Sequence, residues 1–315
     1  MIKKISSPFL GFIFFFSLSE QALAKTEAKQ SVGLNFTSNA NLVNENKISD
    51  FYTQLNSRVS TEFSAVPVYF NLGWLNYFKE TSNNFLSVSL SADIEATQFK
   101  TTSTYWIPKL FHRNYLRDNA ATSDSSFTHT GLGLDLEKIF IKKSDFSLSA
   151  MAGYETRLFS KFQNRNDHEI HFLSDLKYSI DPILKLSAFG GLGLVSSSLS
   201  EYSRNYIEFG GGLKSDTEEK INWGSEAVLV QTTYVNRTIS QATEITKRRG
   251  GTSTKIVESK ETTQFVSVKG QIIYTVRPEW FVQTGLSMNT QSSNNPINSY
   301  SAIEISVSLF TTALP

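Results

Sequence analysis

Cysteine is absent from the 315-residue chain, which excludes disulfide scaffolds and thiolate metal sites. Proline is scarce, with seven residues. After residue 24, no apolar run reaches the roughly 20 residues that a membrane-spanning helix needs. Neither charge sign dominates, because 28 basic and 28 acidic residues remain once Lys3, Lys4 and Glu20 are set aside. That balance argues against a nucleic-acid partner.

The first 24 residues have the pattern of a secretory signal peptide. Lys3 and Lys4 precede the short apolar core FLGFIFFFSL, and Ala22-Leu23-Ala24 fits a cleavage site. An N-terminal membrane anchor is the alternative, but the core is too short to span a bilayer. We therefore expect residues 1–24 to direct export through the general secretory route, and residues 25–315 to form a single domain.

What the chain has in abundance is two-residue alternation. In NNFLSVSLSADIEATQF, residues 83–99, apolar side chains take every second position from Leu86 to Ala96, and Ser, Asp and Glu lie between. Such a strand has one apolar face and one polar face. The 24 Phe and 12 Tyr residues also favour sheet. The chain is predicted to be all-β.

About thirteen segments alternate in this way. They are residues 31–37, 51–63, 67–78, 83–99, 128–138, 146–159, 168–180, 184–195, 205–213, 221–235, 265–276, 280–288 and 300–310. Transmembrane barrels of this type usually have an even number of strands. One further strand near residues 103–111 would give fourteen strands. Treating residues 31–37 as a periplasmic segment before the first strand would give twelve. We favour fourteen because 31–37 alternates well.

Short turns and long polar loops follow one another along the chain. Turns at 141–145, 179–183, 214–220 and 277–279 alternate with loops at 161–167, 197–204, 236–263 and 290–299. This layout is typical of an antiparallel up-and-down barrel with short periplasmic turns and long extracellular loops. The connection over residues 236–263 is predicted to be a hairpin that projects beyond the membrane, with Gly250-Gly251 near its tip. Phe51/Phe63 and Phe146/Phe159 have the spacing of interfacial aromatic girdles.

The final segment, SYSAIEISVSLF at 299–310, resembles the signal that the barrel-assembly machinery reads in outer-membrane β-barrel proteins of Gram-negative bacteria. Phe310 is followed by five more residues, which departs from that pattern. Ser38-Asn39 and Ser49-Asp50 are weakly similar to the opening of putative porin-type barrels. The resemblance implies a bacterial outer-membrane location, with lipid, lipopolysaccharide and the assembly machinery as partners.

If lipid contacts the apolar face, the polar face lines a lumen. With Lys185, five basic and eleven acidic residues would point inward, which favours cations. The expected lumen-lining residues are Arg58, Glu62, Asp93, Glu95, Asp135, Glu137, Glu155, Arg157, Glu169, Asp175, Lys177, Glu208, Glu226, Lys269 and Glu304. We expect a porin-like channel for passive diffusion of small cationic or neutral solutes.

Two other interpretations stay open. The charges could pair and plug the lumen, leaving a structural or adhesin-like barrel whose long hairpin, with Lys247, Arg248 and Arg249 at its tip, contacts a surface. A soluble sheet protein would instead bury its apolar face. Asp167-His168 suggests a protease pair, but neighbouring strand residues point to opposite faces. We therefore expect no catalytic site, metal site or cofactor.

Overall fold

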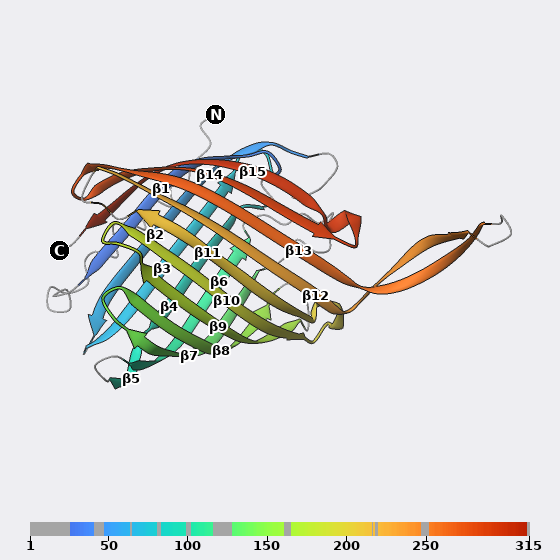
Figure 1. Ribbon diagram of the computed structural model, residues 1–315, viewed down its shortest axis with the longest axis horizontal. Helices are drawn as coiled ribbons and strands as arrows, with labels where there is room; N and C mark the ends of the chain where they lie inside the picture. The colour runs from blue at the N-terminus through green and yellow to red at the C-terminus, as the bar shows by residue number, and fades with distance from the viewer. Residues whose placement is uncertain are drawn as a thin grey trace, which may run out of the picture.

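The computed structural model describes residues 26–40, 47–63, 65–80, 83–98, 102–115, 128–160, 165–215, 217, 220–246 and 252–313. Within this part of the chain, no helix is long and apolar enough to cross a bilayer. Antiparallel strands make up nearly all of it (Figure 1). The predicted signal peptide lies outside the described residues and stays a prediction.

The described part of the chain contains fifteen strands and two short 3-10 helices, η3 (Ser200–Tyr202) and η4 (Pro296–Asn298). The first eight strands are β1 (Glu27–Thr37), β2 (Asp50–Phe63), β3 (Val66–Tyr77), β4 (Phe85–Ala92), β5 (Ile94–Gln98), β6 (Ser103–Tyr115), β7 (His129–Lys142) and β8 (Phe146–Phe159). The others are β9 (Asn166–Ser179), β10 (Leu184–Ser197), β11 (Arg204–Ser215), β12 (Ile221–Thr246), β13 (Thr252–Arg277), β14 (Trp280–Ser293) and β15 (Tyr300–Ala313).

The sheet closes on itself because β1 pairs with β15 as well as with β2. Strands β4 and β5 both pair with β6, so together they form one wall strand that is interrupted at Asp93. The barrel therefore has fourteen wall strands, as we favoured. The further strand near residues 103–111 exists as β6, and residues 31–37 belong to β1, which is a full wall strand and not a segment before the first strand.

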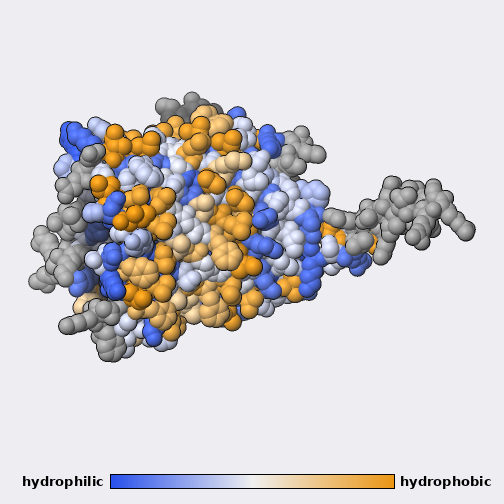
Figure 2. All heavy atoms as spheres, in the orientation of Figure 1, coloured by the Kyte–Doolittle hydropathy of each residue, from blue (hydrophilic) through white to orange (hydrophobic). Residues whose placement is uncertain are grey.

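The outer surface of the barrel is apolar. Leu34, Leu132, Phe172 and Ile305 are each about half exposed, whereas the fully buried side chains, such as Asp135, are polar. Orange hydrophobic residues cover the middle of the barrel wall in Figure 2. A soluble sheet would bury these side chains, so this inverted polarity is that of a membrane barrel.

The aromatic girdle prediction is correct for one pair and wrong for the other. Phe51 and Phe63 are both exposed on the outer face at the two ends of β2. Phe159, by contrast, contacts the Arg165 guanidinium inside the barrel. Phe146 and Phe159 are thirteen positions apart, and an odd separation along a strand places two side chains on opposite faces.

Glycines in the wall make room for aromatic rings that point inward. A side chain at Gly210 would overlap the Phe189 ring, and one at Gly193 would overlap Tyr206. These glycines belong to the GGLGL and FGGGL stretches. Here they allow close packing on the lumen face.

The longest connection is a projecting hairpin, as predicted. Strands β12 and β13 are 26 residues each, and residues 238–246 pair with 252–260 beyond the barrel wall (Figure 1). The wall pairings with β11 and β14 end at Tyr234 and Thr263. The tip, with Lys247, Arg248, Arg249 and Gly250-Gly251, lies outside the described residues.

Candidate functional site

The pairing register sets which side chains face inward. In β7, Leu132 and Leu134 are exposed outward, so Asp135 and Glu137 point to the interior. Continuing the register around the sheet puts all fifteen predicted residues on the face opposite the exposed aliphatic one. Their role as a pore lining stays a prediction.

A charge cluster covers the inner wall of β6 to β9. Asp135 is buried, and its carboxylate is 2.5 Å from Lys109 Nζ and 3.3 Å from His171 Nε2. Lys109 Nζ also lies 3.4 Å from Glu155. The ammonium group therefore bridges carboxylates on two neighbouring strands.

The same cluster continues toward the extracellular end. One guanidinium nitrogen of Arg157 is 2.8 Å from Glu155 and 2.5 Å from Glu169. The hydroxyl of Tyr206 donates to Glu169 at 2.6 Å. The carboxylates on this side of the lumen are paired with basic side chains, which is the arrangement that the plugged-barrel interpretation requires.

Other inward acids lie outside that cluster. Within the described part of the chain, Asp93, Glu208 and Glu304 form no ion pair. The Ser287 hydroxyl donates to Glu304 at 3.3 Å. Asp93 lies at the interruption between β4 and β5, Glu208 on β11 and Glu304 on β15. These three carboxylates therefore leave negative charge on the wall outside the cluster.

A hollow of about 840 Å³ occupies the extracellular end of the lumen. The Arg165 guanidinium lies between two rings there, 3.6 Å from the Tyr202 centroid and 4.0 Å from that of Phe159. Arg165 also forms a buried ion pair of 2.9 Å with Asp167. This stack holds the β8–β9 and β10–β11 loops together at the rim.

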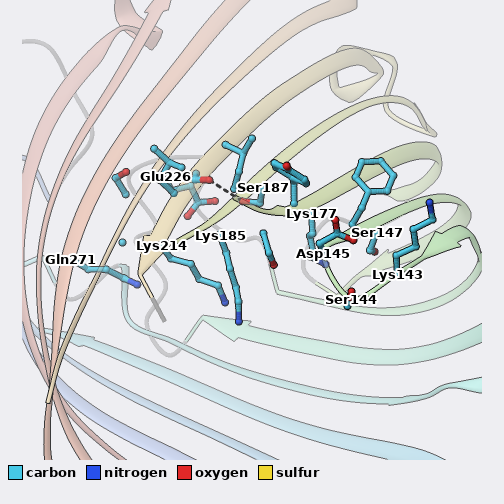
Figure 3. Close-up of a pocket in the computed structure, with 18 of the residues that line it drawn as sticks. Lys143, Ser144, Asp145, Ser147, Lys177, Lys185, Ser187, Lys214, Glu226 and Gln271 are labelled. Atoms are coloured by element: carbon cyan, nitrogen blue, oxygen red, sulfur yellow. Dashed lines mark hydrogen bonds between the residues drawn. The ribbon is translucent and has the colours of Figure 1, made fainter. Parts of the chain in front are cut away.

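A second hollow, of about 410 Å³, lies at the periplasmic end; we call it the lysine pocket (Figure 3). Its lining includes the five lysines 143, 177, 185, 214 and 269, and the two acids Asp145 and Glu226. Lys177 is paired with Asp175 at 2.6 Å. The pocket carries an excess of positive charge in a wall that the sequence suggested was acidic.

The sequence-based charge count missed several residues. Eight basic side chains also line the interior: Lys29, Lys109, Arg113, Lys143, Arg165, Arg204, Lys214 and Arg237. Five acids were missed as well: Glu27, Asp50, Asp145, Asp167 and Glu261. The acidic excess therefore falls from six to three. Most of the missed residues flank the predicted segments or belong to β6, whose faces had not been assigned.

The Asp167-His168 pair is divided between the two faces, as expected. Asp167 points inward to Arg165, while His168 Nδ1 lies 2.7 Å from the hydroxyl of the exposed Tyr154 on the outer face. No group of three metal-ligating side chains occurs among the described residues. The expectation that the barrel is not an enzyme stays a prediction.

No family model matches the chain, and no curated protein matches it. Solved structures with a related fold include an anion-selective porin from Comamonas acidovorans, with 7% identity, coverage of 91% of this chain and 98% of the other, and a TM-score of 0.46. The DcaP outer-membrane channel of Acinetobacter baumannii has 9% identity, coverage of 91% and 96%, and a TM-score of 0.46. A monoaromatic hydrocarbon channel, CymD, has 9% identity, coverage of 93% and 90%, and a TM-score of 0.49.

Likenesses this distant transfer neither solute nor mechanism. The closed wall, the apolar outer band and the charged inner face define the class by themselves. The chain has the fold of a transmembrane β-barrel of the outer-membrane type.

Proposed function

We propose that the protein is a porin-like channel for passive diffusion of small solutes, with a preference for cationic or neutral ones. The observation that carries this proposal is the form of the interior. All described strands belong to the wall or to the projecting hairpin, and both 3-10 helices lie in rim loops, so no described segment crosses the lumen.

The strand number supports an open lumen. Eight-stranded barrels are just wide enough to be filled by side chains, whereas barrels of 16 to 18 strands hold an aqueous channel. Fourteen strands lie much closer to the second group. The hollows of about 840 Å³ and 410 Å³ at the two ends agree with a wall that side chains do not fill.

The preference for cations depends on the acids outside the paired charge cluster of β6 to β9. Asp93, Glu208 and Glu304 lack ion-pair partners within the described residues, and the interior keeps an excess of three acids. Carboxylates that line a pore attract cations and repel anions. Because the excess is small, the expected selectivity is weak.

Recordings of the purified protein in planar bilayers under a salt gradient test the proposal. We expect steady conductance and a reversal potential on the cation side. Neutralising Glu208 and Glu304 to Gln should move that potential toward zero, while the outward Leu132→Val variant should leave it unchanged. Absence of conductance would exclude the channel, and an anion-side potential would exclude the cation preference.

A second candidate function is a surface-interaction barrel, and the anchoring of the hairpin base favours it. Asn236 and Arg237 donate to backbone oxygens of Ser200 and Glu201 in η3, at 3.2 Å and 2.8 Å. On the other strand, the backbone N–H of Thr262 donates to Asn294 at 2.9 Å. A hairpin held on both sides is oriented to meet a partner outside the membrane.

Replacing residues 239–259 by a two-residue turn separates the two functions. A channel should fold and keep or increase its conductance. A surface-interaction barrel should fold but lose adhesion of cells that display it. Adhesion that is unchanged by the deletion would contradict the second candidate.

A further inference from the structure

The projecting hairpin leaves a backbone edge open on each side beyond the barrel wall. Residues 238–246 of β12 pair with residues 252–260 of β13. Within the described part of the chain, neither segment has a second strand partner, because the wall pairings with β11 and β14 end at Tyr234 and Thr263. We propose that residues 238–246 pair with the same residues of a second copy of this chain. The proposal rests on the surface-interaction candidate, whose partner it names, and not on the channel.

The two edges of the hairpin are not equally protected. An edge strand presents an open row of N–H and C=O groups to which another strand can add, and proteins usually guard such edges with lysine, proline or bulges. The β13 edge carries Lys255, Glu258 and Lys260 among its nine residues. The β12 edge, TISQATEIT, has Glu244 as its single charge, no proline or glycine, and no register shift along its length. The β12 edge is therefore the one that favours addition of a strand.

The nine residues TISQATEIT read almost the same in both directions. When two identical strands pair in antiparallel fashion about Ala242, Thr238 lies opposite Thr246. Ile239 then lies opposite Ile245. Threonine pairs and β-branched side chains that face one another stabilise neighbouring strands. Moving the centre by one residue in either direction removes both matches, so the sequence favours a single register.

The acid of each edge avoids its counterpart in this register. Glu244 lies opposite Ser240 of the second copy. The two Glu244 positions are therefore four residues apart along the strands, which is about 13 Å. Like charges directly opposite each other would destabilise the pair. Charge thus permits the register that the matching of side chains favours.

Pairing would also give the ribbon the further strands that it lacks. A two-stranded hairpin is marginally stable in water, and three or more strands are needed for independent stability. Joining two β12 edges produces a continuous four-stranded sheet with the β13 strand of each copy on the outside. The charged β13 edges then flank the sheet and discourage further addition. The contact is two-fold and stops at two copies, because each chain offers one unguarded edge.

Antiparallel pairing also determines how the two barrels face each other. The hairpin projects from the end of the barrel that carries the long loops (Figure 1). Two hairpins that both rise from one membrane cannot run in opposite directions. The pairing therefore joins copies in two membranes that face each other, with one barrel at each end of the joined sheet. The hairpin would act as a contact between cells that display the same protein.

Aggregation of bacterial cells that display the full-length chain, in a strain that otherwise lacks it, tests the proposal. We expect displaying cells to aggregate with one another and to exclude a differently labelled population that does not display the protein. Absence of aggregation would overturn the proposal. Equal inclusion of the non-displaying cells would also overturn it, because the hairpin would then contact another surface component.

Two charge variants test the register. Ile239→Lys/Ile245→Lys should slow aggregation by about tenfold, since the pairing would place like charges opposite each other at both positions. Ile239→Glu/Ile245→Glu should have the same effect for the same reason. Mixing the two populations should restore aggregation, because lysine then faces glutamate. A folding defect is not repaired by mixing, so populations that stay separate when mixed would refute the proposal.

Ser253→Lys/Ser259→Lys is the matched control. These serines are the β13 register partners of Ile245 and Ile239, so the same charge is added on the other strand of the hairpin. Aggregation should be unchanged, and a loss equal to that of the β12 variants would contradict pairing through β12. Bilayer conductance of the same proteins separates the two functions. Aggregation without conductance would contradict the channel alone, whereas conductance without aggregation would contradict the homotypic contact alone.

Discussion

At the scale of single residues, the inner wall depends on charges that satisfy one another. Asp135 is 1% exposed and contacts Lys109 on the adjacent strand β6 and His171 on β9, which lies across Gly153 of β8. A buried carboxylate is tolerated only when donors surround it. Asp175 makes a superficially similar pair, but its partner Lys177 is 68% exposed in its side chain. Water screens the second pair and not the first.

That contrast gives a stability prediction. Asp135→Asn should lower the free energy of unfolding by about 2 kcal/mol, since Lys109 and His171 lose their charged partner. Asp175→Asn should change it by less than about 0.5 kcal/mol. Urea unfolding in lipid vesicles measures both. Equal losses for the two variants would mean that water reaches Asp135 as freely as Asp175.

At the scale of elements, the projecting hairpin is the exception to the uniform wall. Strand β12 leaves the wall after Tyr234, and β13 rejoins it at Thr263. A register shift between β12 and β13 separates Thr233 from Thr238. A two-stranded ribbon is only marginally stable by itself. The contacts at its base therefore decide how rigidly it projects. Arg237 carries several of them, because it lies 4.2 Å from the Tyr234 ring and 3.6 Å from Glu261.

Removing that arginine should loosen the hairpin alone. We expect Arg237→Ala to speed proteinase K cleavage within residues 238–260 by roughly tenfold, because local opening becomes less costly. The barrel should keep its heat-modifiable migration on a gel. Arg277→Ala, at the opposite end of β13, serves as the control. A cleavage rate equal to that of the unmodified protein would show that the contacts of Asn236 and Asn294 suffice.

At the scale of the whole molecule, polarity is inverted relative to a soluble protein. Ile305 is about half exposed on the outer face near the middle of β15, and its neighbour Ser306 faces inward toward Gly285. The Ile305 side chain therefore faces lipid, whereas the Ser306 side chain faces the lumen. Adjacent residues therefore respond in opposite ways to the same substitution.

Arginine at these two positions tests the orientation of the wall. Ile305→Arg should lower the free energy of unfolding in lipid by about 2–4 kcal/mol, because a charge would enter hydrocarbon. Ser306→Arg should cost far less and should shift the reversal potential toward anions. Unfolding in vesicles and bilayer recording measure the two effects. A larger loss for Ser306→Arg would reverse the assignment of the faces.

The sequence by itself determined the strand pattern and the inverted barrel. Alternation such as that of residues 86–96 is a local property of the chain, and it fixes two faces without any knowledge of neighbours. Parity then left twelve or fourteen strands, and the alternation of residues 31–37 favoured fourteen, with one further strand near residues 103–111. The separation of Asp167 from His168 followed from the same periodicity.

Only the tertiary structure decided how the inward charges combine. Lys185 and Lys214, or Lys109 and Asp135, are far apart in sequence and meet because strand register brings them together. Register depends on turn lengths and bulges summed around a closed sheet, so an error of one residue moves a side chain to the other face. Alternation placed the predicted residues on the correct face, but it could not show which of them meet, and it left out the charged residues that flank the predicted segments or belong to β6. It therefore predicted an acidic wall, while the folded barrel has a paired charge cluster, scattered acids and a group of lysines at the periplasmic end.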